Sequence, residues 1–295
     1  MGTTDFSIAA VERDTGLSKD VLRMWERRYG FPQPERDGNG ERLYPAEQVA
    51  RLRLMKRLMD QGHRPGRLMQ ASDEELAQLA PRRVSAPTPA PILPLEPLLE
   101  LIKRHDTFAF RQQMQQLLSR EGLLRFVQDT VAPLTERVGD AWMDGEIRVY
   151  EEHLYTEQVK RLLRQAIATL PAANGAPRIL LTTPPEEQHS IGLLMAEAVL
   201  TLEGASCIAL GTQTPLPEIV QAVGDSRIDV VALSISSAFP NRQVLPLVQQ
   251  LRASLPENVA LWVGGGAVRR LTPPSGVRLL HSLPDALAAL EEWRA

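Results

Sequence analysis

The residues best suited to chemistry lie in the segment Thr182–Gly192, where Glu187 stands two positions before His189. This segment follows the apolar run Ile179-Leu180-Leu181. We therefore predict a loop at the carboxyl end of a parallel strand, where open α/β folds bind ligands. A neutral imidazole is the commonest metal ligand, and a carboxylate usually holds its second nitrogen. The pair predicts a metal-binding histidine, and Gly192 allows a bulky group to lie close to the backbone.

The last third of the chain must provide the sheet that positions this loop. Apolar segments alternate there with helix-like segments, a pattern typical of a doubly wound parallel sheet of five strands. The glycines at 264–266 follow one strand, so the backbone there can also approach a ligand closely. The predicted strands are Arg178–Leu181, Ala205–Leu210, Val230–Ser234, Ala260–Val263 and Val277–Leu280. The predicted helices are Gly192–Leu202, Leu216–Val223, Pro240–Leu255 and Leu283–Trp293, with a short turn near Ala267.

Residues 98–172 are predicted to form a four-helix bundle, because apolar residues recur there at three- and four-residue spacing. Nine residues separate Trp142 from the pair Glu152-His153. This spacing places the tryptophan at a helix boundary and the pair on the next helix. On spacing alone, a core tryptophan and a solvated Glu–His face are favoured. The bundle helices are expected at Leu98–His105, Thr107–Ser119, Glu121–Glu136 and Val149–Ala168.

Residues 1–80 are predicted to form a head domain, and its first 70 residues are basic whereas the rest of the chain is acidic. Residues 1–70 carry 13 Lys+Arg and 10 Asp+Glu (13 − 10 = +3), so the other 225 residues carry −3 − 3 = −6. A basic head on an acidic body suggests an anionic partner for the head alone. A helix starting at Ile8, a break at Gly16, an N-cap at Ser18 and a helix over Lys19–Tyr29 predict a helix-turn-helix.

A turn at residues 37–40, flanked by Arg36 and Arg42, predicts a small β-wing whose arginines meet phosphates. A further helix is expected from Pro45. An ordinary helical domain with a solvated arginine face is the alternative. Residues 81–97 contain six prolines in 17 positions and predict an extended linker.

Cysteine usage and the start of the chain indicate where the protein works. Cys207 is the single cysteine, which excludes an intramolecular disulfide and a cysteine-based zinc site and fits a reducing cytosol. No charged-then-apolar signal and no apolar run of about 18 residues is present. We therefore expect a soluble, cytoplasmic protein.

The head reads Leu22-Arg23-Met24-Trp25-Glu26-Arg27-Arg28-Tyr29-Gly30-Phe31-Pro32, followed by Arg42-Leu43-Tyr44. This combination resembles the winged-helix DNA-binding domain of MerR-family transcription regulators over about residues 5–75. A long dimerisation helix normally follows in that family, whereas here the proline-rich linker follows, so a dimer or tetramer must form elsewhere. The resemblance implies a core role for Trp25 and contacts to double-stranded operator DNA by Arg23, Arg28, Tyr29, Arg42 and Tyr44.

Three short motifs follow one another along the predicted sheet domain. They are E-x-H-x-x-G ending at Gly192, S-x-S at Ser234 and Ser236, and G-G at Gly264 and Gly265. They are separated by 41 and 27 residues. This arrangement resembles the cobalamin-binding domain of cobalamin-dependent methyltransferases and mutases, which shows D-x-H-x-x-G, S-x-L and G-G. Glu187 and Ser236 are the two departures from that pattern.

The resemblance implies that His189 replaces dimethylbenzimidazole as the lower axial ligand of cobalt. The displaced tail would lie between Ser234 and the glycines at 264–266. The bundle resembles the cap over the upper face of cobalamin in such proteins. W-x9-E-H marks caps that accommodate an adenosyl group, which implies roles for Trp142, Glu152 and His153 in binding adenosylcobalamin.

The order of head, linker, bundle and sheet resembles the CarH and LitR class of light-responsive repressors. In that class adenosylcobalamin promotes a tetramer that holds operator DNA in the dark, and light breaks the Co–C bond and releases the DNA. In its light-sensing members a histidine follows the tryptophan and ligates cobalt after the adenosyl group leaves. Here Met143 follows Trp142, and a thioether matches Co(III) poorly. We therefore expect cobalamin binding, with Met143 in the site, but no stable bis-histidine product.

Three other functions remain open from the sequence. The chain could sense cobalamin or another tetrapyrrole without photochemistry, or its sheet domain could be a protein-interaction module without a ligand. An enzymatic role as a corrinoid methyl carrier is disfavoured, because a carrier needs no DNA-binding head. We therefore predict a regulator and not an enzyme.

Overall fold

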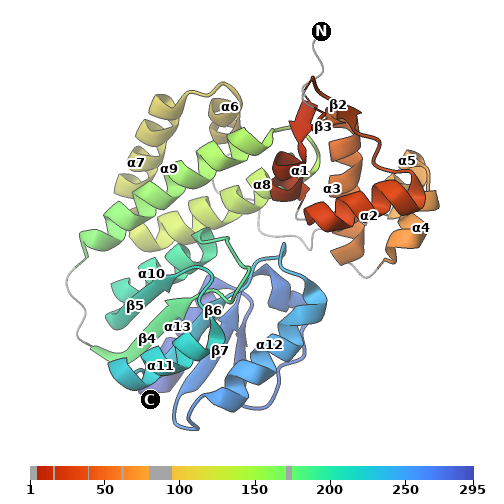
Figure 1. Ribbon diagram of the computed structural model, residues 1–295. Helices are drawn as coiled ribbons and strands as arrows, with labels where there is room; N and C mark the ends of the chain where they lie inside the picture. Colours follow the sequence, from red (N-terminus) through yellow and green to blue (C-terminus); the bar gives the residue numbers. More distant parts are fainter. Residues whose placement is uncertain (1–4, 16, 39, 61–62, 80–94, 171–174) are drawn as a thin grey trace. The chain divides into compact units, whose positions relative to one another are not determined.

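The computed structural model describes residues 5–15, 17–38, 40–60, 63–79, 95–170 and 175–295 (Figure 1). The chain divides into two compact units. The first comprises residues 1–88 and 141–149, and the second comprises residues 89–140 and 150–295. The expected linker at 81–97 lies outside the described residues except for its last three positions, 95–97. Among the described residues, no helix combines the length and apolarity needed to cross a membrane.

The head contains the predicted helix-turn-helix. Helix α1 (Ile8–Thr15) is followed by α2 (Lys19–Tyr29), whose N-cap Ser18 accepts a hydrogen bond from the Val21 N–H at 3.3 Å. Helix α2 ends at Gly30, which has the left-handed φ of 68° that suits glycine. The remaining helices are α3 (Ala46–Asp60), α4 (Pro65–Gln70) and α5 (Asp73–Leu79).

The expected wing is the antiparallel pair β2 (Glu35–Arg36) and β3 (Arg42–Pro45). A third strand, β1 (Asp5–Ser7), pairs with the other edge of β3, and the sequence did not predict it. Three residues are too few to show the alternation by which a strand is found. The wing is therefore part of a three-stranded sheet in the order β1-β3-β2.

The helical segment contains α6 (Glu96–Lys103), α7 (Thr107–Arg125), α8 (Ala132–Met143) and α9 (Val149–Ala168). The predicted helix Glu121–Glu136 is corrected. The chain bends at Gly122 (φ 74°), continues through the π-helical segment η1 (Phe126–Val131) and extends in α8 to Met143. Helical periodicity does not reveal this bend because apolar spacing continues through it.

The sheet is parallel with strand order β5-β4-β6-β7-β8. Its strands are β4 (Gly175–Thr182), β5 (Ala205–Gly211), β6 (Val230–Ser234), β7 (Ala260–Gly264) and β8 (Val277–Leu280). The connecting segments are α10 (Ile191–Leu202), α11 (Leu216–Ser226), α12 (Asn241–Ser254), η2 (Gly266–Arg270) and α13 (Leu283–Arg294). The five predicted strands are thereby confirmed.

Both faces of the sheet are covered, as the continuous apolar runs predict. In β6, Val231 and Leu233 join the core under α11 and α12, while Val230 and Ala232 are also buried but outside that cluster. Helix α10 packs against α13, and α11 packs against α12. The doubly wound architecture is therefore confirmed, and its loops meet at the carboxyl edge.

Candidate functional site

Two loops meet at the topological switch point of the sheet, between β4 and β6, where the connections from successive strands run to opposite sides. Strand β4 is followed by the loop that carries His189, and its neighbour β6 is followed by the loop that carries Ser236. Chain order places β5 on the opposite side of β4. In open α/β sheets ligands bind at such a switch point, outside the carboxyl ends of the strands.

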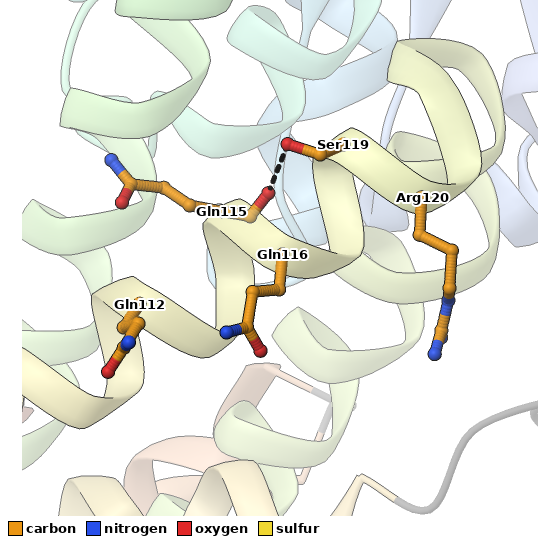
Figure 2. A pocket seen from close by; sticks show the side chains of 5 residues that line it. All are labelled: Gln112, Gln115, Gln116, Ser119 and Arg120. Carbon is orange, nitrogen blue, oxygen red and sulfur yellow. Dashed lines mark hydrogen bonds between the residues drawn. The ribbon is translucent and has the colours of Figure 1, made fainter.

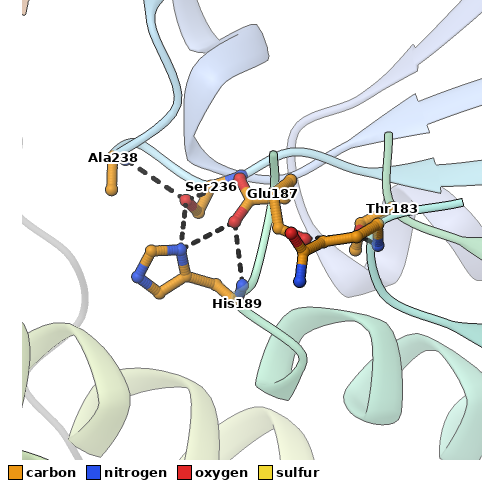
Figure 3. Close-up of polar contacts among 6 residues, drawn as sticks. Thr183, Glu187, His189, Ser236 and Ala238 are labelled. Atoms are coloured by element: carbon orange, nitrogen blue, oxygen red, sulfur yellow. Dashed lines mark hydrogen bonds and ion pairs between the residues drawn. The ribbon is translucent and has the colours of Figure 1, made fainter. Parts of the chain in front are cut away.

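The carboxylate of Glu187 joins these loops (Figure 3). Its Oε1 accepts the backbone N–H of His189 at 2.8 Å and lies 2.7 Å from His189 Nδ1. Its Oε2 accepts the N–H and the hydroxyl of Ser236, both at 2.8 Å. The Glu187 side chain is 1 % exposed. A buried charge is tolerated only with such partners.

These hydrogen bonds determine which ring nitrogen of His189 carries a proton. A carboxylate can only accept, so His189 Nδ1 must carry the proton that it shares with Glu187. The Ser236 hydroxyl, 3.1 Å from Nδ1, donates to Glu187 and can accept from Nδ1. The His189 side chain is 61 % exposed. Its Nε2 is thus the nitrogen left to bind a ligand, as expected for a metal-binding histidine.

The pKa values of Glu187 and His189 depend on each other and on a carboxylate of the bundle, Glu152. Burial by itself raises the pKa of Glu187, but hydrogen bonds from the His189 ring, the His189 charge and the backbone N–H groups of His189 and Ser236 lower it below its usual range. The hydrogen bond to Glu187 raises the pKa of His189 against the effect of burial, and the charges of Glu187 and Glu152 add to the rise. Glu152 on α9 therefore lies within electrostatic reach of the imidazole.

Thr183 holds the loop through hydrogen bonds of its side chain, and the sequence analysis did not single it out. Its buried hydroxyl donates to the Glu187 carbonyl at 2.7 Å and accepts the N–H of Gln213 at 2.9 Å. Gln213 has a left-handed φ of 61°. The signal available in the sequence was a hydroxyl residue at the end of a buried strand, which by itself indicates only a loop.

The glycines of the E-x-H-x-x-G and G-G motifs lie close to other parts of the protein itself. A Cβ on Gly192 would lie 3.0 Å from Ser234 Oγ, and a Cβ on Gly264 would lie 3.4 Å from the Leu280 carbonyl. A Cβ on Gly265 would lie 2.3 Å from the Ile235 carbonyl oxygen. Because strand β6 pairs with β7 as far as Ser234 and Gly264, these glycines first serve the packing of two neighbouring loops.

The bundle residues singled out from the sequence lie on α8 and α9. Trp142 Nε1 is buried and has no hydrogen-bond partner in the part of the chain that the structure describes, and Met143 is the last residue of α8. Glu152 accepts the Thr156 hydroxyl at 2.7 Å and lies 2.7 Å from His153 Nδ1. The His153 side chain is 62 % exposed, whereas that of Glu152 is 28 % exposed, so only the histidine lies on a solvated face.

In the head, Arg23, Arg28 and Tyr29 are exposed on α2, and the Arg28 guanidinium lies 5.3 Å from the centre of the Tyr29 ring. Arg42 is half-buried and forms an ion pair with Glu26 at 2.8 Å. The expectation for Tyr44 is wrong. Its side chain is fully buried in the core of the head and cannot reach DNA.

A shallow hollow lies on one face of α7 (Figure 2). It is lined by Gln112, Gln115, Gln116, Ser119 and Arg120, none of which was predicted as a site residue. Ser119 donates to the Gln115 carbonyl at 2.9 Å. The hollow offers only exposed polar groups of one helix, so the loop between β4 and α10 remains the candidate site. Within the described residues, no group of three or more His, Cys, Asp or Glu could hold a metal ion.

Comparison with known proteins places each part of the chain. Residues 6–74 match the MerR HTH family regulatory protein model, and residues 94–167 and 177–273 match two B12 binding domain models. The HTH-type transcriptional repressor CarH of Myxococcus xanthus is 30% identical over 259 residues, covering 86% of this chain and 86% of that protein. The chain belongs to the CarH family.

A second member of this family, the HTH-type transcriptional repressor CarA of Myxococcus xanthus, is 30% identical over 271 residues, covering 89% of this chain and 87% of that protein. The monomethylamine corrinoid protein of Methanosarcina barkeri is 15% identical with a TM-score of 0.52, over 66% of this chain and 96% of that chain. That likeness shows a shared fold.

Proposed function

We propose that the chain is a DNA-binding transcriptional repressor controlled by adenosylcobalamin held between the bundle and the sheet domain. The observation that carries the proposal is the Glu187–His189 pair at the switch point. An exposed imidazole with its proton held on Nδ1 by a buried carboxylate has the donor set that a single axial metal ligand needs. The residues present therefore fit the cobalt of cobalamin.

Each proposed site residue has a defined task. His189 Nε2 would bind the cobalt, while Glu187 and Ser236 hold the imidazole ring. Gly192, Ser234, Gly264 and Gly265 line the loops toward the nucleotide tail. Trp142, Met143, Glu152 and His153 would contribute to binding the adenosyl group. Adenosylcobalamin, when bound, supplies a Co–C bond that light can cleave.

Control of DNA binding follows from self-association. The head presents exposed arginines on α2, and a single head has a net charge of only +3 over residues 1–70. A dimer or tetramer presents several heads to one operator, so that modest site affinities combine into tight binding. We propose that cobalamin sets this oligomeric state and that loss of the adenosyl group in light reverses it.

An absorption spectrum tests the proposal. The full-length protein is mixed with adenosylcobalamin in the dark, desalted, and measured before and after green light. Retention of the corrinoid with a light-dependent spectral change is expected. His189→Ala should weaken retention, whereas His281→Ala, an exposed histidine after strand β8, should not. Full retention with an unchanged spectrum in His189→Ala would contradict the ligand assignment.

A second candidate is a cobalamin or tetrapyrrole sensor without photochemistry. Met143 favours it, because a thioether does not give the stable second ligand to Co(III) that an imidazole gives. Retention of adenosylcobalamin with an identical spectrum after illumination supports the sensor. Failure to retain any corrinoid contradicts both candidates.

A further inference from the structure

The two departures from the cobalamin-binding pattern meet at one carboxylate. Glu187 stands where the pattern has Asp, and Ser236 stands where it has Leu. These two side chains share the hydrogen bond from the Ser236 hydroxyl to Oε2, at 2.8 Å. They come from loops 49 positions apart in the sequence. Nothing in the sequence spacing indicates that the two departures belong together.

The carboxylate divides its oxygens between the two loops. Oε1 binds the two N–H groups of His189, and Oε2 binds the two donors of Ser236. An aspartate would be shorter by about 1.5 Å, one carbon–carbon bond. With the backbone fixed, it could not keep both pairs of contacts. A glutamate without the Ser236 hydroxyl would keep its length but lose one of its four donors.

Among the described residues, the acceptor of the Ser236 hydroxyl proton is Glu187 Oε2, at 2.8 Å. The hydroxyl accepts the Ala238 N–H at 3.2 Å and lies beside His189 Nδ1, which is itself a donor. Its proton is therefore directed to Glu187. This ties the orientation of the carboxylate, and through it the imidazole, to the loop after β6 (Figure 3).

We propose that Glu187 and Ser236 act as one compensated pair, in which Ser236 is a positioning residue that holds the Glu187 carboxylate so that His189 keeps its proton on Nδ1. This assigns Ser236 a role through Glu187 rather than a contact with the cofactor. The inference rests on the proposed function of His189 as the cobalt ligand. It also makes a claim about the protein without cofactor, which can be measured separately.

The first test reads the imidazole in the protein without cofactor. The Nδ1–H proton of His189 is followed by NMR, with His189→Gln used to assign it. A resonance protected from exchange with water is expected at neutral pH. Ser236→Ala should speed its exchange several-fold, Ser236→Thr, which keeps the hydroxyl, should restore protection, and Ser237→Ala on the same loop should leave it unchanged. Equal protection in Ser236→Ala would overturn the proposal.

The second test is a double-mutant cycle on adenosylcobalamin binding in the dark. Glu187→Asp and Ser236→Leu should each raise the Kd about tenfold or more, as changes behind a metal ligand usually do. The double variant, which restores the usual pair, should bind far better than the product of the two losses predicts. Losses that simply multiply would overturn the proposal. If Ser236→Ala does not fold, the comparison of Glu187→Asp with the double variant decides.

The two tests separate the inference from the proposed function. If the unmodified protein retains no cobalamin, the proposed function fails, and the Nδ1–H measurement still decides the role of Ser236. If cobalamin is retained but the two changes act independently, His189 remains the ligand and the compensated pair is rejected.

Discussion

At the residue scale, the carboxylate of Glu187 is the hydrogen-bond acceptor that holds the two loops of the site together. Four donors surround it, and its side chain is 1 % exposed. An amide at this position can accept through only one oxygen and turns its own N–H₂ toward donors of His189 or Ser236. Buried donors without acceptors cost about 1–3 kcal/mol each.

Glu187→Gln should therefore lower the free energy of unfolding by about 1–3 kcal/mol near neutral pH, measured by urea denaturation. Glu186→Gln, the same change on an exposed neighbour, should have little effect. Because the pKa of Glu187 is lowered in the folded protein, its contribution is present above the unfolded pKa of about 4.3 and is lost as pH falls through the folded pKa. A difference between the proteins that stays constant down to pH 3 would contradict this assignment.

Cys207 on β5 provides an independent residue-scale prediction. Burial raises the pKa of its thiol to about 11, with a smaller rise from the charge of Glu197. Since the thiolate is the nucleophile and its fraction at pH 7.5 is far lower than for a thiol of pKa about 8.5, alkylation by iodoacetamide should be at least about tenfold slower. The rate should rise about tenfold per pH unit. Mass spectrometry can follow the single cysteine, and the urea-unfolded chain is the control.

At the element scale, the sheet was predictable and the loop geometry was not. Continuous apolar runs such as Val230–Ser234 indicate buried parallel strands. The E-x-H spacing located the hydrogen-bonded pair Glu187 and His189. The bend at Gly122 and the short strand β1 leave no periodic signal. The contact between Glu187 and Ser236 depends on strand order, which alternation of apolar segments does not reveal. Tyr44 was itself expected to contact DNA, and its burial depends on how β3 packs in the core of the head, which the sequence pattern does not reveal.

The loop after β7 gives an element-scale prediction. Gly265 has a φ of 101°, and a Cβ there would lie 2.3 Å from the Ile235 carbonyl oxygen. Gly265→Ala should destabilise the protein by about 2–4 kcal/mol, because strain and a backbone clash add. Gly224→Ala in α11 meets nothing within 4 Å and should stabilise by about 0.5–1 kcal/mol. Thermal unfolding of the two variants measures both effects, and equal melting temperatures would contradict the account.

At the scale of the whole molecule, DNA binding should depend on the head and on the number of heads. Arg28→Ala should weaken binding to duplex DNA, selected from a random pool by the unmodified protein, at least about fivefold and reduce the salt slope by about 1. Arg242→Ala, an exposed arginine on α12, removes the same charge from the acidic body and serves as the control. If both variants lost the same amount of DNA affinity, α2 would not be the DNA-contacting helix.

Self-association can be followed by light scattering. Full-length protein loaded with adenosylcobalamin in the dark should have a higher molar mass than the cofactor-free protein, and green light should return it to the lower mass. DNA affinity should change in parallel, because several heads bind one operator more tightly than one head does. A mass that is the same in all three states would refute control through oligomerisation.

The shared carboxylate at the switch point also constrains the history of this site. A chain with Asp and Leu that first acquired Glu at position 187 would bury a longer carboxylate with too few donors, which costs stability and disturbs the histidine. A chain that first acquired Ser at position 236 would gain only a half-buried hydroxyl near solvent, which costs little stability even where it weakens cofactor binding. We therefore expect glutamate without the serine to cost more stability than serine without the glutamate. Relatives that carry Asp with Ser should be found as intermediates, and relatives that carry Glu with Leu should be rare.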